Sequence, residues 1–590
     1  MTATKQDESF TNGNSDHIST ESDVEEPAAQ RQRTDVHWAD LIQSAIVTGK
    51  EQLKSDYTQS RPYPHGIFKN IFEPEFLKSV LTEVKCNSQV NFKESDLFRV
   101  YQSIDLANVA IDDHSNQEKL PNTIQLRQFL YSDGWRHLIE DVSGLERGTL
   151  NEKVDCAFNC HTTGCHLLCH DDVIGTRKIS YILYLTDEGW KEEEGGALEL
   201  YDSVEYGKGE AKQRLPNCVP SKTILPLFNH MGFFEVRPGF SFHAVQEVFG
   251  DRPRLSLQGW YHTDKPPKGI GKATLERLKA TSDHFESPFT PVEIPPHSLM
   301  SATTDVCILF NEDLNFLRKY VHPVYLNPDA IREINQRFEE DSSVQLRNFL
   351  LPHWVDKLRK ATEEEKQESS DGYTAGVTKD WKLVGPSHKQ RYLQYTNRIS
   401  DDSADLVETG EILAHLQHVL QSSVFLRFLL SITSLSPTSY RGHVRRFRPG
   451  LDYTVAHYGL LQLTSVLDAT LCFVAGQGED VAETDDPLEA DVAWQSGDVG
   501  AFECYIAADD EEGSEAAADE YHEDDDTGLL SVSASNNTLS LVYRDPGTLR
   551  FIKYVGSQAP SSRWDISMEY QVTEEAGDCA NIEVEKNLSA

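Results

Sequence analysis

The feature that most constrains the fold is a pattern of helical segments followed by strand-like segments, which occurs twice along the 590 residues. In the first half, apolar residues recur at three- and four-residue spacing from Trp38 to Ile46, which indicates a helix. Strand-like runs punctuated by Gly and Pro follow, at Lys178 to Leu185, Gly232 to Arg237 and Arg254 to His262. This order predicts a mainly β domain with flanking helices, an α+β architecture.

The second half repeats the order. Helical patterns cover 329–367 and 411–432, and strand-like runs follow at 451–475, 493–506, 529–533 and 539–553. The Pro-rich end of the intervening stretch is typical of a linker. We therefore expect a first domain at 38–280, a linker at 281–310 and a second domain at 311–580.

Three polar segments stand apart from these domains. Residues 1–37 have almost no aliphatic content and predict a disordered tail. The acidic stretches at about 479–491 and 509–526 interrupt strand-like runs and predict solvated loop insertions. They contribute to a net charge of −40, which argues against a nucleic-acid binder by bulk charge. Solubility is the simplest role for this charge, and attraction to a basic partner is the alternative.

Other features restrict the compartment. Apolar runs such as Phe425 to Leu430 fall far short of the roughly 20 residues that a membrane span needs, so we expect no membrane helix. The ten Cys show no paired framework along the chain. A reducing compartment, cytosol or nucleus, is therefore expected.

The most informative residues are a His-x-Asp pair, His170 and Asp172, and a later His243. In extended backbone, residues i and i+2 point to the same face, so this pair could bind one metal ion. Two imidazoles and one carboxylate form the facial triad of non-haem Fe(II) oxygenases. Arg254 opens a strand downstream and shares its face with Ser256. A guanidinium there suits the distal carboxylate of 2-oxoglutarate.

Several longer segments resemble one family. They are the run from His170 to Leu185, Gly195 to Tyr201, Phe233 to Val236, Arg254 to His262, Tyr543 to Pro546 and Leu549 to Lys553. They resemble the 2-oxoglutarate- and Fe(II)-dependent ribosomal prolyl hydroxylases, the family of the yeast termination-and-polyadenylation protein and its fission-yeast and animal relatives. The resemblance implies two tandem double-stranded β-helix (jelly-roll) domains, of which only the N-terminal one is catalytic.

The same resemblance implies residue roles. His170, Asp172 and His243 would be the Fe(II) ligands, Arg254 would bind the distal carboxylate of 2-oxoglutarate, and the Tyr184 hydroxyl would assist it. O2 would be the oxidant and ascorbate the reductant. Decarboxylation of 2-oxoglutarate to succinate would be coupled to 3-hydroxylation, or 3,4-dihydroxylation, of a prolyl residue.

The implied substrate is a basic small-subunit ribosomal protein at the decoding centre, with effects on translation termination and accuracy, in nucleus and cytoplasm. Translation-termination or mRNA-decay factors are further candidate partners. The alternative is an oxygen-sensing adaptor that regulates a hypoxia or sterol transcription factor, or an mRNA-decay complex, without catalysis. Direct RNA contact is not expected, because an acidic chain offers carboxylates to the second-half cluster of Arg441, Arg445, Arg446 and Arg448.

Some residues depart from the pattern or allow another interpretation. His161 stands where the family has an active-site tyrosine, nine residues before the first ligand. The run of Cys and His between Cys156 and His170 could instead form a zinc site. Cys169, beside a ligand, is a candidate for oxidation. In the second half, His443 and His457 lack a carboxylate two positions later, so no metal is expected there.

Overall fold

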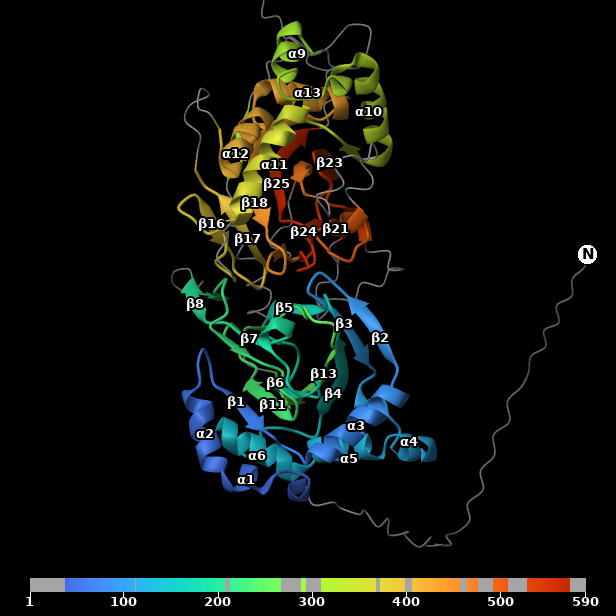
Figure 1. The fold of residues 1–590 in the computed structure, drawn as a ribbon, viewed down its shortest axis with the longest axis vertical. Coiled ribbons are helices and arrows are strands. Elements are labelled where there is room, and N and C mark those ends of the chain that lie inside the picture. The colour runs from blue at the N-terminus through green and yellow to red at the C-terminus, as the bar shows by residue number, and fades with distance from the viewer. Residues whose placement is uncertain are drawn as a thin grey trace, which may run out of the picture. The chain divides into compact units, whose positions relative to one another are not determined.

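The computed structural model describes residues 38–111, 113–206, 213–266, 288–292, 309–367, 372–397, 406–456, 464–475, 492–507 and 528–573. The expected tail, both acidic insertions, His457 and most of the linker lie outside these residues, so the linker bounds remain a prediction. The described part is mainly β with flanking helices, which confirms the expected fold class (Figure 1). None of its helices combines the length and apolar character needed to span a membrane.

The N-terminal half, residues 38–266, is built on one eleven-stranded antiparallel sheet that curls into a half-barrel (Figure 1). Its strands are β1 (His65–Lys69), β2 (Val90–Glu94), β3 (Phe98–Ser103), β4 (Val154–His161), β5 (His166–His170), β6 (Arg177–Tyr184), β7 (Leu198–Leu200), β10 (Lys222–Ile224), β11 (His230–Glu235), β12 (His243–Val245) and β13 (Arg254–His262). The order is β1-β11-β6-β13-β4-β3-β5-β12-β7-β10, with β2 on β3. A separate hairpin joins β8 (Ser203–Tyr206) and β9 (Gln213–Pro216).

Helices cover one face of this sheet (Figure 1). They are α1 (Ser44–Thr48), α2 (Lys50–Gln59), α3 (Pro74–Asn87), α4 (His114–Lys119), α5 (Pro121–Leu130) and α6 (Asp133–Ser143). Helix α6 ends at Gly144, whose φ of 76° suits glycine. Its Trp135 is fully buried and packs on Phe68 and Phe129, with ring centroids 5.3 and 4.6 Å apart.

Strand alternation divides the barrel into a helix-facing core and an inner face. On β6, Ile179, Tyr181 and Leu183 belong to the core cluster shared with the helices. Ile182 and Tyr184 belong to a second cluster on the opposite face. Because successive strand residues point to opposite faces, this parity also fixes which residues of neighbouring strands face the barrel interior.

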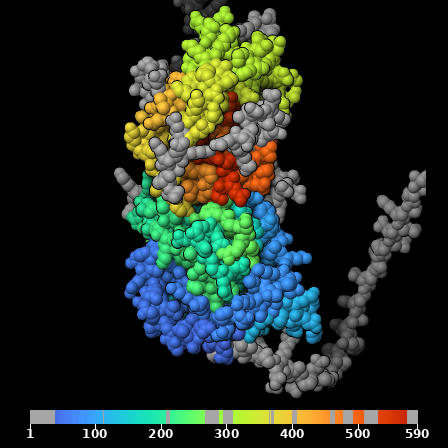
Figure 2. Space-filling view, viewed as in Figure 1, coloured from blue at the N-terminus to red at the C-terminus, as the bar shows by residue number. Residues whose placement is uncertain are grey.

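The C-terminal half, residues 288–573, repeats this plan. A nine-stranded antiparallel sheet contains β14 (Thr290–Pro291), β15 (Ser343–Leu346), β16 (Trp381–Val384), β17 (Gln390–Tyr395), β18 (Ser436–Phe447), β19 (Tyr453–Thr454), β20 (Val466–Phe473), β23 (Thr538–Arg544) and β25 (Arg563–Thr573). A smaller sheet contains β21 (Glu503–Ala507), β22 (Gly528–Val532) and β24 (Thr548–Ile552). The helices are α9 (Asn311–Leu317), α10 (Pro328–Asp341), α11 (Pro352–Gln367), α12 (Thr409–Leu420), α13 (Ser423–Thr433) and α15 (Val492–Gln495). The two halves pack directly against each other (Figure 2).

Several expected segments differ from the structure. The helix expected at 411–432 is divided into α12 and α13, and the strand-like run at 539–553 is divided into β23 and β24, which belong to different sheets. The helical pattern at 329–367 is interrupted, because α10 ends at Ser342 with a left-handed φ of 53° and β15 follows before α11 begins. The strand-like run at 493–506 begins instead as the short helix α15 and becomes a strand only at Glu503.

Candidate active site

His170 and His243 lie opposite each other on neighbouring antiparallel strands. His170 ends β5, His243 begins β12, and the strand register pairs them. In each ring, Nδ1 lies within hydrogen-bond distance of the carbonyl oxygen two residues earlier, 2.8 Å from Leu168 and 2.9 Å from Ser241. Because a carbonyl oxygen only accepts, each Nδ1 is the donor in this bond, and Nε2 is the nitrogen left to face the space between the two rings.

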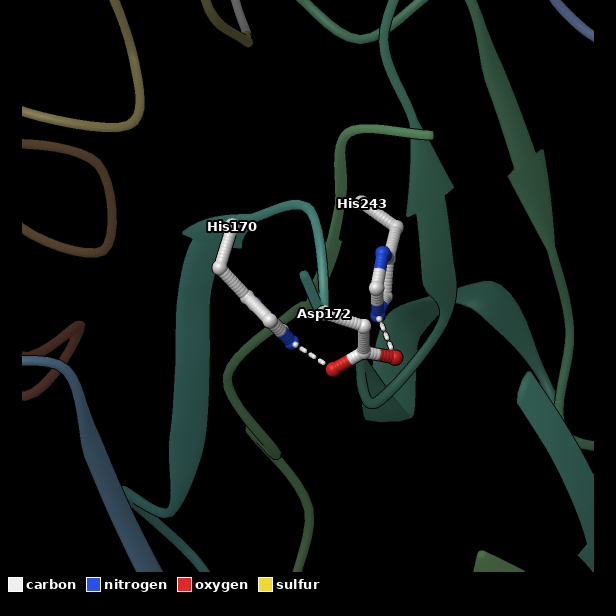
Figure 3. A group of neighbouring side chains, drawn as sticks. All are labelled: His170, Asp172 and His243. Atoms are coloured by element: carbon white, nitrogen blue, oxygen red, sulfur yellow. Dashed lines mark ion pairs between the residues drawn. The ribbon is translucent and has the colours of Figure 1, made fainter. Parts of the chain in front are cut away.

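Asp172 places its carboxylate between the two imidazoles (Figure 3). Its Oδ1 is 3.1 Å from Nε2 of His170, and its Oδ2 is 3.4 Å from Nε2 of His243. The structure brings these residues together, but the predicted extended backbone from His170 to Asp172 is wrong. Strand β5 ends at His170, and Asp172 has a left-handed φ of 59°. A turn after the strand, which Asp tolerates better than most residues, therefore aims the carboxylate.

The charge state of this group suits a cation. Burial opposes ionisation of Asp172, but His243 and His170 hold the pKa of its carboxyl well below its usual range. The donor atoms of the three side chains lie within 4.8 Å of one another. This is the one such group of His, Cys, Asp and Glu in the part of the chain that the structure describes. Two imidazole nitrogens and one carboxylate oxygen fit Fe(II) and leave coordination positions open.

The run from Cys156 to His170 forms no group of metal-binding side chains, which argues against the zinc alternative. Cys169 is 1% exposed, and burial raises the pKa of its thiol far above the ordinary value. Because the thiolate is the reactive form, burial also argues against the proposed sensitivity of Cys169 to oxidation.

Trp260 is a site residue that sequence reasoning missed. Its indole N–H donates to Oδ2 of Asp172 over 2.9 Å. A bond of this kind orients a ligating carboxylate. Trp260 and Arg254 lie on β13 an even number of residues apart, so strand parity alone could have placed both on the inner face.

Arg254 is a fully buried cation with an unused donor. Its Nε donates to the carbonyl of Gly196 over 2.6 Å, and its Nη1 donates to the hydroxyl of Ser256 over 3.3 Å. Its Nη2 has no hydrogen-bond partner, and none of the carboxylates in the described ranges forms an ion pair with Arg254. Burial lowers the pKa of this guanidinium. An uncompensated buried charge is costly, so this residue fits an anionic ligand.

Tyr184 and His161 lie beside this guanidinium. The Tyr184 ring centroid is 5.3 Å from Cζ of Arg254, and the buried Tyr184 hydroxyl also lacks a partner. Burial raises the pKa of Tyr184 to about 12, so it stays a hydrogen-bond donor. Nδ1 of His161 is 3.5 Å from Nη1 of Arg254. Burial, with help from Arg254, holds the pKa of His161 well below its ordinary value, so this imidazole is neutral.

A pocket opens onto His170, Asp172 and His243. Its walls are mainly apolar or aromatic and include Leu167, Ile182, Leu198, Phe234, Val245 and Trp260. Such walls hold little water and favour reaction at a carbon–hydrogen bond over reaction with solvent.

The clustered arginines of the C-terminal half are paired with carboxylates. As expected from the sequence, each Arg of the second-half cluster has a carboxylate partner: Arg441 with Glu569, Arg445 with Asp565, Arg446 with Glu365 and Arg448 with Asp452. His443 is bonded to Gln394, and burial lowers its pKa to about 4.

Comparisons with known proteins agree with this division into two halves. The profile described as "2OG-Fe(II) oxygenase superfamily" matches residues 156–262. The profile described as "Oxoglutarate and iron-dependent oxygenase degradation C-term" matches residues 312–578.

Relatives match over most of the chain. The prolyl 3,4-dihydroxylase OGFOD1 of Ostreococcus tauri is 38% identical over 519 residues, which cover 86% of this chain and 95% of the relative. The prolyl 3-hydroxylase OGFOD1 of Xenopus laevis is 26% identical and is covered to 86%, as is this chain. The prolyl 3-hydroxylase sudestada1 of Drosophila melanogaster is 27% identical, with 85% of this chain and 81% of the relative covered.

Proposed function

The chain belongs to the family of 2-oxoglutarate- and Fe(II)-dependent oxygenases that includes these prolyl hydroxylases, and we propose that it hydroxylates proline in a protein substrate. The product would be a 3-hydroxyprolyl or 3,4-dihydroxyprolyl residue, as the names of the relatives suggest. One observation carries the proposal: an inward-facing His-Asp-His group shares one barrel with a buried arginine that has no carboxylate partner among the described residues.

In this proposal, His170 and His243 hold Fe(II) through Nε2, and Asp172 holds it through a carboxylate oxygen. Arg254 and Tyr184 bind the distal carboxylate of 2-oxoglutarate, because their unused donors are the ones that a buried carboxylate needs. When bound, Fe(II) and 2-oxoglutarate supply an O2-dependent oxidation that yields succinate and CO2 and hydroxylates a carbon–hydrogen bond.

The protein itself orients the metal-binding side chains and excludes water from the site. The Leu168 and Ser241 carbonyls fix the tautomer of the two imidazoles, and Trp260 fixes the carboxylate of Asp172. The apolar walls of the pocket keep the oxidising group away from bulk solvent.

The substrate that we propose is a basic protein of the small ribosomal subunit at the decoding centre, met in nucleus or cytoplasm, with ascorbate as reductant. The net charge of −40 supports a basic partner, because opposite charges speed encounter. Attraction of this kind is screened by salt. Hydroxylation at low substrate concentration should therefore slow as the salt concentration rises. A rate independent of salt would mean that the acidic residues serve only to keep the protein soluble.

The central test is incubation of the full chain with Fe(II), 2-oxoglutarate, ascorbate and small-subunit ribosomal proteins purified from the organism that makes this chain. Intact-mass spectrometry should show one or two added oxygen atoms on one protein, and fragment spectra should place them on a proline.

A matched pair of histidine variants controls this test. His170→Ala should abolish the mass increase. His230→Ala should retain it, because His230 bonds its Nδ1 to a carbonyl in the same way but lies outside the group of donors. Full activity of His170→Ala would refute the assignment of the site.

A further inference from the structure

The reverse side of the strands that carry the site is covered by the C-terminal half. His243 pairs with Leu200 of β7, and the next pair is Ala244 with Glu199. Because strand residues alternate, Ala244 and Glu199 point away from His243. A small cavity on that side is lined by both residues together with Tyr373 and Arg391 of the C-terminal half. The back of the proposed iron site is thus an interface between the two halves.

Glu247 is the first carboxylate held across this interface. It follows β12, is 2% exposed, and accepts hydrogen bonds from the backbone N–H of Ser557 at 2.9 Å and from its hydroxyl at 3.0 Å. The hydroxyl of Tyr554 donates to it over 3.2 Å. Glutamate is almost never buried this deeply without partners, and these donors all come from the C-terminal half.

The backbone of Glu247 continues this connection to Arg254. The N–H of Gly196 donates to the Glu247 carbonyl over 3.0 Å, and the Gly196 carbonyl accepts from Nε of Arg254 over 2.6 Å. The fit is close, because a Cβ on Gly196 would lie 2.8 Å from Cδ of Arg254. Gly196 also has a φ of 70°, which glycine adopts without strain. Ser557, Glu247, Gly196 and Arg254 therefore form one continuous chain of contacts.

Glu199 is the second carboxylate held across the interface. It is 2% exposed, and its two oxygens accept from the hydroxyls of Tyr373 and Tyr201. Arg391 lies over the Tyr373 ring, with Cζ 4.6 Å from the centroid, and donates to the Tyr201 hydroxyl over 3.4 Å. Glu199 thus ties β7, which pairs with β12, to the C-terminal half.

We propose that the C-terminal half is a positioning element of the oxygenase site. Glu247 sets the place of Arg254 through Gly196, and Glu199 sets the place of His243 through the pairing of β7 with β12. Neither glutamate touches substrate or metal, so both are positioning residues. The proposal rests on the assignment of Arg254 and His243 in the proposed function.

The test compares Glu247→Gln with the unmodified full chain. Glutamine keeps only one acceptor oxygen and no charge, so its hydrogen bonds with Ser557 and Tyr554 are weaker and the connection to Gly196 is loosened. We expect Kd for 2-oxoglutarate, measured by calorimetry in the presence of Mn(II), to rise about tenfold, the lower end of the loss seen when an outer partner is removed. KM for 2-oxoglutarate should rise likewise, with kcat at saturation retained. Glu247→Asp, which keeps the charge, should have a smaller effect.

Tyr373→Phe tests the second connection. Loss of the hydroxyl should weaken Mn(II) binding, followed by electron paramagnetic resonance, by about tenfold. The matched control is Lys553→Met, which removes a cross-interface ion pair with Glu94 away from the ligand-bearing strands and should change neither affinity. The inference is overturned if the unmodified chain binds 2-oxoglutarate and Mn(II), and Glu247→Gln and Tyr373→Phe bind them with the same affinities as the unmodified chain. Failure of the unmodified chain to bind 2-oxoglutarate would instead overturn the proposed function.

Discussion

Replacement of Arg254 by Met should strongly weaken ligand binding but change the stability of the ligand-free chain little. The buried charge of this arginine serves to bind a ligand and does not stabilise the fold. Without ligand, Met removes an uncompensated buried charge, which costs several kcal/mol. It also leaves the Gly196 carbonyl and the Ser256 hydroxyl without their arginine donors, at about 1–3 kcal/mol each. The two effects are of similar size and opposite sign. We therefore expect the free energy of unfolding without ligand to change by no more than about 2 kcal/mol.

With ligand, the effect of Arg254→Met is large. Loss of one partner of a buried ion pair costs about 3–5 kcal/mol, which weakens 2-oxoglutarate binding by at least about 100-fold. At a concentration 100 times its Kd, 2-oxoglutarate should stabilise the unmodified chain by about 2.7 kcal/mol. At the same concentration it should stabilise the variant by less than about 0.5 kcal/mol. The measurement is denaturant unfolding with Mn(II) in place of Fe(II), with and without 2-oxoglutarate.

Arg563→Met is the matched control. Arg563 is equally buried, but it is paired with Asp565 and Glu503 at 3.1 and 3.2 Å. Its loss should destabilise the chain by about 3–5 kcal/mol without any ligand. The reasoning fails if Arg254→Met destabilises the ligand-free chain as much as the control does, or if 2-oxoglutarate still stabilises the variant fully.

Two further predictions concern the metal and pH. Trp260→Phe removes the indole donor to Asp172 and should weaken Mn(II) binding about tenfold, as measured by titration; unchanged affinity would show that the turn alone aims the carboxylate. Burial lowers the pKa of His443 to about 4, so between about pH 6.5 and 4 the unfolded chain binds a proton at this residue that the folded chain does not. Stability should fall as pH falls through this range, and less steeply in His443→Gln; parallel unfolding curves against pH would contradict this.

The strands of the N-terminal half were predictable where the alternation of polar and apolar residues is regular along the sequence. Strand β13 was expected at Arg254 to His262 and is found there, because polar and apolar residues alternate from Arg254 to Gln258. The site residues were predictable because the segments that carry them resemble those of a known family. The direction of the Asp172 side chain was not predictable from strand geometry, because Asp172 itself has a left-handed backbone in place of the expected extended one.

The C-terminal half shows where local patterns fail. Strand β25 is its central strand, yet no strand-like run was expected at Arg563–Thr573. Its buried residues include Arg563 and Asp565, which look like surface residues in sequence. They are buried because the partners lie on other strands: Asp565 stands opposite Arg445 of β18 and pairs with it at 2.8 Å. The residues near Asp565 in the sequence give no indication of a partner 120 residues away.

The same reasoning explains why the two positioning glutamates could not be found before the structure. Glu199 and Glu247 follow or interrupt short apolar runs, and a glutamate in such a place is usually a solvated side chain. What buries them is a set of hydroxyl and amide donors 174 and 310 residues further along the chain. Metal ligands are recognised by their residue types, because the chemistry of a metal restricts which side chains can bind it. A residue that positions such ligands has no required type, so only the packing of the two halves identifies it.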